Sequence, residues 1–167
     1  NYHWLIVVQS FLMSNYFSIV QKAFIVNTRW QALILKRTNS DSKYDIWDLP
    51  GGVQDFGHSL RDSLGKLVRK DCSLNLTIIS IPLNITSYIQ DGRQVVRIVY
   101  LCRAAGTVSL NSNHNDHLWI DPVDHQHYAF PDEGYHSAFS NYLSHSSIAS
   151  VEFLGPGLIS TTSEPIS

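Results

Sequence analysis

The stretch from residue 47 to residue 74, WDLPGGVQDFGHSLRDSLGKLVRKDCSL, decides how the rest of the chain can fold. The proline and two glycines at 50–52 interrupt regular structure and let the backbone approach a neighbour closely. From Ser59 onward, leucine and valine recur every three or four residues, and Ser59 with Asp62 supplies a start like a capping box. The stretch therefore predicts a loop that leads into an amphipathic helix ending near Cys72.

Residues typical of strands flank this stretch on both sides. The predicted strands occupy residues 16–26, 32–35, 78–89, 94–102 and 118–120. A turn at Asp91-Gly92 resembles that of a β-hairpin, and a second helix is predicted at about residues 134–143. This order of elements fits neither an alternating doubly wound sheet nor an all-β sandwich. We therefore predict an α/β fold in which helices cover the faces of a mixed sheet.

The two ends of the chain differ from the middle. Residues 4–12 are apolar but are broken by Gln9 and Ser10, so they fall short of the ~20 residues of a membrane span, and no basic leader precedes them. We expect residues 1–12 to be an N-terminal extension of doubtful origin, since Met13 is the only methionine. Residues 147–167 are rich in Ser, Thr, Gly and Pro and are predicted to be a tail whose apolar segment 151–154 packs as a short strand. We expect residues 13–146 to form one domain.

Charge and cysteine content narrow the possible partners. Lys and Arg total 12 against 14 for Asp and Glu, which gives a net charge of -2. Binders of nucleic acid or of membrane surfaces need a basic excess, so we expect neither partner. Cys72 and Cys102 form no CxxC pair, which excludes a disulfide framework and a zinc ribbon. We interpret both as small core residues of a cytoplasmic protein.

The stretch also resembles the Nudix hydrolase box, which reads Gly, five residues, Glu, seven residues, Arg-Glu, aliphatic, any residue, Glu-Glu, any residue, Gly, aliphatic. Aligned from Gly52 to Leu74, the chain has His58 for the first Glu, Lys66 for Arg, Leu67 for the next Glu, Lys70 and Asp71 for the Glu pair, and Ser73 for Gly. The surroundings resemble the family from about residue 17 to residue 143. This resemblance implies the Nudix-type α/β/α sandwich with a mixed sheet.

The resemblance implies an enzyme, dependent on Mg²⁺ or Mn²⁺, that cleaves the pyrophosphate of a nucleoside diphosphate linked to another group. Its metal positions would be Leu67, Lys70 and Asp71, with the carbonyl of Gly51 as a further ligand. Magnesium prefers oxygen ligands in a near-octahedral shell, and only Asp71 among these side chains offers a charged oxygen. We therefore predict weak metal binding, at most, at Asp71 and Gly51.

Two lysines change the sign of this helix face. Unit charges ~4 Å apart interact by about 4 kcal/mol at an effective dielectric constant of 20, so Lys70 would offset what Asp71 offers a metal. With Lys66 one turn earlier, the face would repel Mg²⁺ and attract phosphate. We predict that Lys66, Lys70 and the amides of Gly51 and Gly52 hold a nucleotide or another small phosphorylated ligand, with weak or absent hydrolysis.

Further residues complete the predicted site. Asp71 and His58 are the candidate catalytic groups, and His58 would act as a general base because imidazole titrates near neutral pH. Arg37 and Trp47 are candidate substrate contacts. The aromatic side chains that could stack on a base are Trp30, Tyr44, Trp47 and Phe130.

Alternatives stay open for the site and the function. The lysines could be an ordinary solvated face, and Leu67 could belong to the core. The chain could instead be an active Mg²⁺-dependent enzyme that recruits carboxylates from elsewhere than the metal positions of the box, or a non-catalytic interaction module. The carboxylates in question are Asp55, Asp62, Asp116 and Asp132. A homodimer also stays open.

The eight histidines offer a rival metal chemistry. His58, His114 and His117 could bind a transition metal together with Asp116. The spacing is not specific, since a His-x-x-His pair in a polar loop is more often solvent-exposed imidazole. The remaining candidates, His125, His127, His136 and His145, are predicted to lie in loops or on a helix surface.

Overall fold

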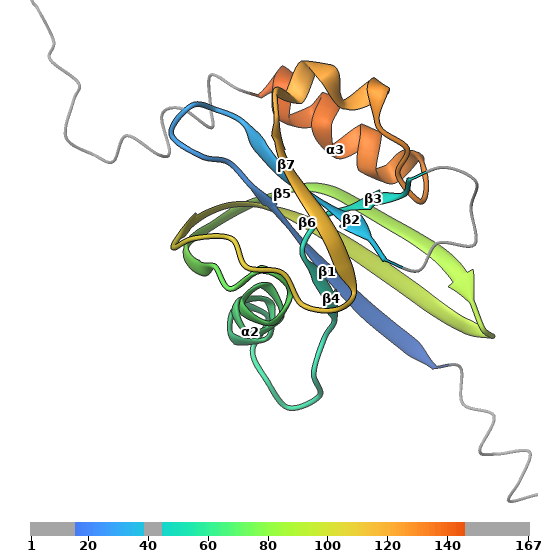
Figure 1. Cartoon of the computed structure of the whole chain (residues 1–167). Helices are drawn as coiled ribbons and strands as arrows, with labels where there is room; N and C mark the ends of the chain where they lie inside the picture. Colours follow the sequence, from blue (N-terminus) through green and yellow to red (C-terminus); the bar gives the residue numbers. More distant parts are fainter. Residues whose placement is uncertain (1–15, 39–44, 146–167) are drawn as a thin grey trace, which may run out of the picture.

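The computed structural model describes residues 16–38 and 45–145, and these residues form two β-sheets with helices on both sides (Figure 1). In chain order, the elements are β1 (Phe17–Ile25), β2 (Ala32–Arg37), β3 (Trp47–Asp48), β4 (Gly51–Val53), α2 (Leu60–Cys72), β5 (Asn75–Gln90), β6 (Arg93–Ala105), β7 (His114–Ile120), the 3-10 helix η1 (Pro122–His127) and α3 (Glu133–Ser144). The predicted α/β class is confirmed. The expectations for residues 1–12, residues 147–167 and Tyr44 fall outside the described residues.

The larger sheet is mixed, as predicted. Its strand order is β4-β1-β6-β5, with β1 parallel to β6 and the other two pairs antiparallel. The smaller sheet has the order β3-β2-β7 and is antiparallel. The short strands β3 and β4 were not predicted, because proline and glycine break the side-chain pattern there while the backbone still pairs with β2 and β1.

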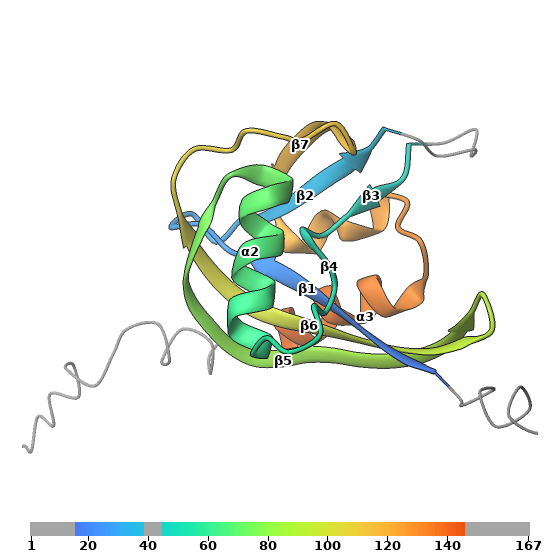
Figure 2. The same ribbon diagram turned by 90° about the horizontal axis from the view of Figure 1, so that it is seen from below.

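The two helices cover opposite faces of the larger sheet (Figure 2). Alternation along β1 decides which side chain meets which helix. Ala23 and Ile25 pack in the cluster that contains α2, whereas Phe24 packs in the cluster that contains α3. Phe24 contacts Phe139 of α3 edge to face, with ring centroids 4.7 Å apart. This arrangement is the α/β/α sandwich that the resemblance implies, and the free thiols of Cys72 and Cys102 are buried in it as predicted.

Local signals set the ends of α2 and the β5–β6 turn. The Ser59 hydroxyl accepts a hydrogen bond from the amide of Asp62 at 3.1 Å, which confirms the predicted helix start. The helix ends at Cys72, and the capping residue Ser73 has a φ of 62° and donates its amide to the carbonyl of Arg69. Asp91 and Gly92 both have positive φ, as the predicted hairpin turn requires.

Among residues 16–38 and 45–145, no helix is both long enough and apolar enough to cross a membrane.

Candidate functional site

A polar cleft of about 300 Å³ opens between β1, β2, the neighbouring strands β3 and β4, α2 and the start of β7. We call it the cleft. The residues that line it are Lys22, Arg37, Asp48, Gly51, Asp71, Asn113 and His114. They come from five parts of the chain that only the fold brings together.

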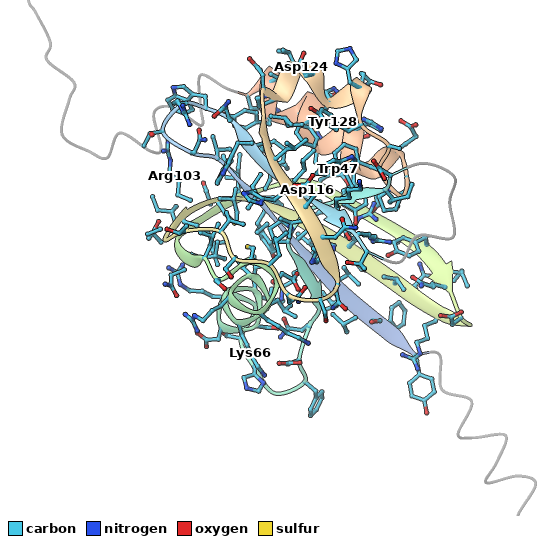
Figure 3. All side chains as sticks on the ribbon, viewed as in Figure 1. Trp47, Lys66, Arg103, Asp116, Asp124 and Tyr128 are labelled. Atoms are coloured by element: carbon cyan, nitrogen blue, oxygen red, sulfur yellow. The ribbon has the colours of Figure 1, made fainter. Side chains whose placement is uncertain are left out.

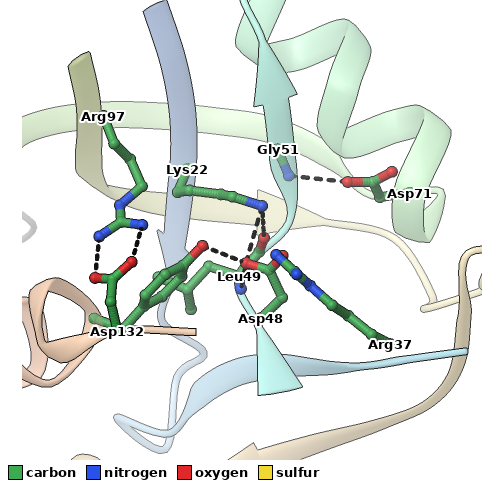
Figure 4. A network of polar contacts seen from close by, with 9 residues as sticks. Lys22, Arg37, Asp48, Leu49, Gly51, Asp71, Arg97 and Asp132 are labelled. Atoms are coloured by element: carbon green, nitrogen blue, oxygen red, sulfur yellow. Dashed lines mark hydrogen bonds and ion pairs between the residues drawn. The ribbon is translucent and has the colours of Figure 1, made fainter. Parts of the chain in front are cut away.

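Asp48 organises the floor of the cleft (Figure 4). Its carboxylate lies 2.9 Å from the Lys22 ammonium and 2.6 Å from the guanidinium of Arg37. It also accepts hydrogen bonds from the Tyr135 hydroxyl at 2.9 Å and from the Leu49 amide at 2.7 Å. Burial alone would raise the pKa of Asp48, but Lys22 and Arg37 lower it to about 2. The carboxylate is therefore ionised at neutral pH.

The two cations exceed the charge of the carboxylate they share. Lys22 is almost wholly buried, and its ammonium also donates to the carbonyl of Leu49 at 3.0 Å. The Arg37 side chain is 41% exposed and therefore accessible from the cleft. Two positive charges against one negative charge give this cluster an excess of +1, and the Asp71 carboxylate on the helix side of the cleft offsets it. An anion is therefore favoured beside Arg37 and Lys22, away from Asp71.

The helix side of the cleft is held by Asp71. Its carboxylate accepts hydrogen bonds from the Gly51 amide at 2.9 Å and from the Asn111 side chain at 3.2 Å. Gly51 has a φ of 136°, and a Cβ atom there would overlap the carbonyl oxygen of Gln21. The position therefore requires glycine, and Asp71 ties β4 to α2 through it.

Asn111 extends this hydrogen-bonded chain to His114. Its carboxamide oxygen lies 3.1 Å from His114 Nδ1 and can only accept, so Nδ1 carries a proton. Burial lowers the pKa of His114, which favours the neutral ring at neutral pH. The structure thus links Asp71, Asn111 and a neutral His114 along one wall of the cleft.

An adjoining cavity of about 340 Å³ shares Lys22 and Arg37 with the cleft. Arg97 lies in its wall and donates to Asp132, with Nη1 2.7 Å from Oδ2. The Arg97 guanidinium also lies over the Tyr135 ring, 4.2 Å from its centroid. The cavity therefore combines a paired guanidinium and carboxylate with aromatic surface.

No protein-family model matches the sequence, and no curated protein matches it. Solved structures do match. The chain resembles the MutT protein from Methanosarcina mazei Go1 at 19% identity and a TM-score of 0.67, covering 80% of this chain and 98% of that one. It resembles a Nudix hydrolase from Nitrosomonas europaea at 10% identity and a TM-score of 0.64, covering 76% and 88%. A C. elegans Ap4A hydrolase matches at 13% identity and a TM-score of 0.62, covering 79% and 98%.

The chain has the Nudix fold. The residues aligned with the Nudix box accordingly form the β4–α2 connection and α2 itself. Of the predicted site residues, Gly51, Asp71 and Arg37 line the cleft, and Gly52 lines the adjoining cavity.

The other predicted residues in the Nudix box lie elsewhere. Lys66 projects outward from α2 (Figure 3) and forms an ion pair with Asp55 at 2.8 Å. Lys70 is exposed and is not among the residues that line the cleft. His58 is exposed, with Nδ1 3.3 Å from the carbonyl of Phe56. This placement favours the solvated-face alternative for the lysines.

Hydrophobic packing accounts for two further candidates. Leu67, at a box position where the family has glutamate, is half-buried, and a Cβ atom at Gly52 would lie 3.3 Å from its side chain. Trp47 is 8% exposed and packs edge to face against Tyr128 (Figure 3). Phe130 is also a core residue, whereas Trp30 is 44% exposed. Leu67 and Trp47 therefore serve the packing of the Nudix fold.

The rival histidine site is not formed by the described residues, among which no three His, Cys, Asp or Glu side chains cluster as metal ligands. His58 precedes α2, whereas His114 and His117 lie on β7. The prediction that His125 is a surface residue is wrong, because η1 packs against α3. Its ring is buried and stacks on Phe139 with centroids 5.2 Å apart.

The other carboxylates that could replace the metal ligands of the box do not complete a metal site in the cleft either. Asp55 pairs with Lys66, Asp62 with Ser59, and Asp132 with Arg97. Asp116 accepts from the backbone amide of His117. Asp48 and Asp71 are the carboxylates that line the cleft, and both already accept hydrogen bonds. This donor set does not fit the oxygen shell that Mg²⁺ prefers.

Sequence reasoning missed Lys22, Asp48, Asn111 and Arg97. A usable signal existed for two of them, since Lys22 is the single charge of β1 and Arg97 is the single charge of the predicted strand 94–102. A charge in a buried strand requires a partner, so such a position predicts a buried ion pair. No local pattern marks Asp48 as that partner.

Proposed function

We propose that the cleft binds a nucleotide or another small phosphorylated ligand and hydrolyses it weakly or not at all. The observation that carries this proposal is the pair of cations, Lys22 and Arg37, on the single carboxylate of Asp48. In a cleft of the Nudix fold, these cations offer the positive charge for phosphate that a metal would otherwise supply.

The chemistry of the two cations suits a phosphate. Arg37 presents a planar fork that matches phosphate oxygens in two parallel hydrogen bonds, and the Lys22 ammonium acts as a compact point charge. Each unit charge ~4 Å from a phosphate oxygen contributes about 4 kcal/mol before desolvation, at an effective dielectric constant of 20. Asp48 holds both groups in place, so a ligand meets cations that are already oriented.

The two cavities suggest how the ligand is arranged. Volumes of about 300 and 340 Å³ are typical of small-molecule sites, and Lys22 and Arg37 line both of them. We place the phosphates in the cleft and the remainder of the ligand beside Tyr88, Arg97 and Asp132 in the adjoining cavity. The similarity to an Ap4A hydrolase supports a nucleotide as the ligand class.

Weak hydrolysis follows from the groups that α2 supplies. A metal ion can activate water and stabilise the developing charge, and the donors present here hold one poorly. Leu67 and Lys70 have no oxygen to offer, and Asp71 already accepts from Gly51 and Asn111. We therefore propose that Asp71 and the Gly51 carbonyl bind Mg²⁺ or Mn²⁺ weakly at most.

The proposal assigns Lys66 and Lys70 a minor role, because Lys66 is occupied by Asp55 and both side chains are exposed. We also propose a reducing compartment such as the cytoplasm, since both thiols are free and buried.

Calorimetry with ADP-ribose and inorganic pyrophosphate tests this function. Arg37→Gln is expected to weaken binding by roughly tenfold or more, the loss typical of a hydrogen bond to a charged group, and Arg37→Lys to give an intermediate value. Lys36→Gln is the matched control, because Lys36 precedes Arg37 in β2 but pairs with Asp45. Equal affinities for all four proteins would contradict the proposal. Rapid turnover of ADP-ribose with Mg²⁺ or Mn²⁺ would contradict weak hydrolysis.

A further inference from the structure

No element of the described residues covers one end of the larger sheet on the side that α2 occupies. Along β1, Ala23 and Ile25 lie beneath α2, and Phe17 and Ile19 continue the same face toward the start of the strand. The amino end of β1 and the β5–β6 turn extend beyond α2 (Figure 2). Phe17 is 71% exposed and Ile19 38% exposed.

The strand register shows that neighbouring side chains extend this face across the sheet. Residues directly opposite one another in paired strands share a face. Ile19 lies opposite Val96, and Gln21 opposite Ile98, which in turn faces Ile85. We call the apolar members of this surface the open face. They are Phe17 and Ile19 of β1, Val96 and Ile98 of β6, and Ile85 and Ile89 of β5.

Six of the nine positions that share this surface by register are apolar, and none of the nine is charged. The other positions that share it by register are Gln21, Ser87 and Gln94. Ile85 and Ile89 are 62% and 68% exposed. An exposed surface that is mainly apolar and uncharged commonly marks an interaction site. The cleft lies elsewhere, since Lys22 alternates with Ala23 along β1 and points to the opposite face.

The sequence immediately before β1 matches this surface in character. Residues 1–15 contain no Asp, Glu, Lys or Arg, and the runs WLIVV at 4–8 and FLM at 11–13 are apolar. This segment joins the described chain at Tyr16, next to Phe17 at the rim of the open face. The surface that contains the open face runs along β1 from Phe17 to Gln21, about 13 Å at 3.3 Å per residue. Ten residues, 4–13, are long enough to cover that length in a helical or an extended conformation.

We propose that residues 4–13 of this chain dock on the open face and bury it. The proposal rests on the apolar character of both partners, on the absence of charge from both, and on their direct connection at Tyr16. It commits to an intramolecular contact, and it is independent of the function proposed for the cleft.

Hydrogen exchange of the full chain, read by mass spectrometry at several protein concentrations, tests the proposal. Amides in residues 4–13 are expected to exchange at least about tenfold more slowly than in a free peptide of residues 1–15, as local protection requires. The double substitution Ile85→Ser and Ile89→Ser is expected to abolish this protection. Val123→Ser is the matched control, because Val123 is similarly exposed, at 61%, but lies on η1.

Each other outcome overturns the proposal. Exchange as fast as in the free peptide would mean that the segment does not dock, and this comparison needs no variant. Protection that survives the double substitution would place the segment elsewhere. Protection that falls on dilution, together with a dimer in sedimentation, would mean that a second copy covers the open face.

Discussion

The ammonium of Lys22 lies 2.9 Å from one oxygen of the Asp48 carboxylate, and Arg37 contacts the other oxygen at 2.6 Å. Three strands contribute these groups, so the pairing exists only in the folded chain. Because Asp48 is buried, its charge is stable only while these cations remain beside it. The same arrangement orders both cations for a ligand.

Replacing the shared carboxylate is expected to destabilise the protein strongly. Asp48→Asn leaves Lys22 buried beside a neutral partner, and breaking a buried pair in this way costs about 3–5 kcal/mol. Urea unfolding measures the change in the free energy of unfolding. Asp45→Asn is the control, since its pair with Lys36 is largely exposed and its loss should matter little. Equal effects of the two substitutions would contradict the assigned role of Asp48.

The depressed pKa of Asp48 predicts acid sensitivity. The folded pKa of about 2 lies below the ordinary value of 3.8, so the unfolded chain binds the proton more readily. This contribution is fully present above pH 3.8, is lost as the pH falls toward 2, and amounts to about 2 kcal/mol at 1.36 kcal/mol per pKa unit. Unfolding measured between pH 5 and pH 2 should show a steeper loss for the natural chain than for Asp48→Asn. Parallel curves would show that another group is responsible.

Two glycines are expected to respond in opposite ways to alanine. Gly51→Ala forces a side chain into the carbonyl of Gln21 at a φ of 136°, so it should destabilise by several kcal/mol and distort the cleft. Gly65→Ala lies in α2 with nothing within 4 Å of the new atom, and should stabilise by about 0.5–1 kcal/mol. Thermal unfolding of both variants checks the signs. A neutral effect at Gly51 would mean that β4 does not pack on β1 as described.

The two facing histidines predict a second loss of stability, at mildly acidic pH. His125 Nδ1 lies 2.9 Å from His136 Nδ1. Burial and the neighbouring His136 lower the pKa of His125 below 6.5, so the unfolded chain gains the proton first. Stability is therefore retained above pH 6.5 and falls as the pH decreases through the lowered pKa.

Thermal unfolding of His125→Phe at pH 7.5 and pH 5 measures that contribution. The variant keeps a ring stacked on Phe139 and should lose less stability between the two pH values than the natural chain. His127→Phe is the control, since the His127 side chain is 78% exposed. An unchanged pH dependence in the His125 variant would refute the assignment of this loss of stability to His125.

Local patterns predicted the elements that local interactions determine. The Ser59 and Asp62 pair marked the start of α2, and Asp91-Gly92 marked the hairpin, because each signal acts within four residues. The cleft was harder to predict, since its pairs join residues far apart, such as Lys22 with Asp48. The lysines at Nudix box positions predicted a more positive site whose cations come from α2. In the structure the cations of the cleft are Lys22 of β1 and Arg37 of β2.

Calorimetric titration of inorganic pyrophosphate and ADP-ribose, in EDTA and then in Mg²⁺, tests the central claim most directly. The account predicts that both ligands bind in EDTA and that Mg²⁺ changes the dissociation constant by less than about threefold, or ~0.7 kcal/mol. Binding that appears only with Mg²⁺ would contradict it, because the metal and not Lys22 with Arg37 would then hold the phosphates.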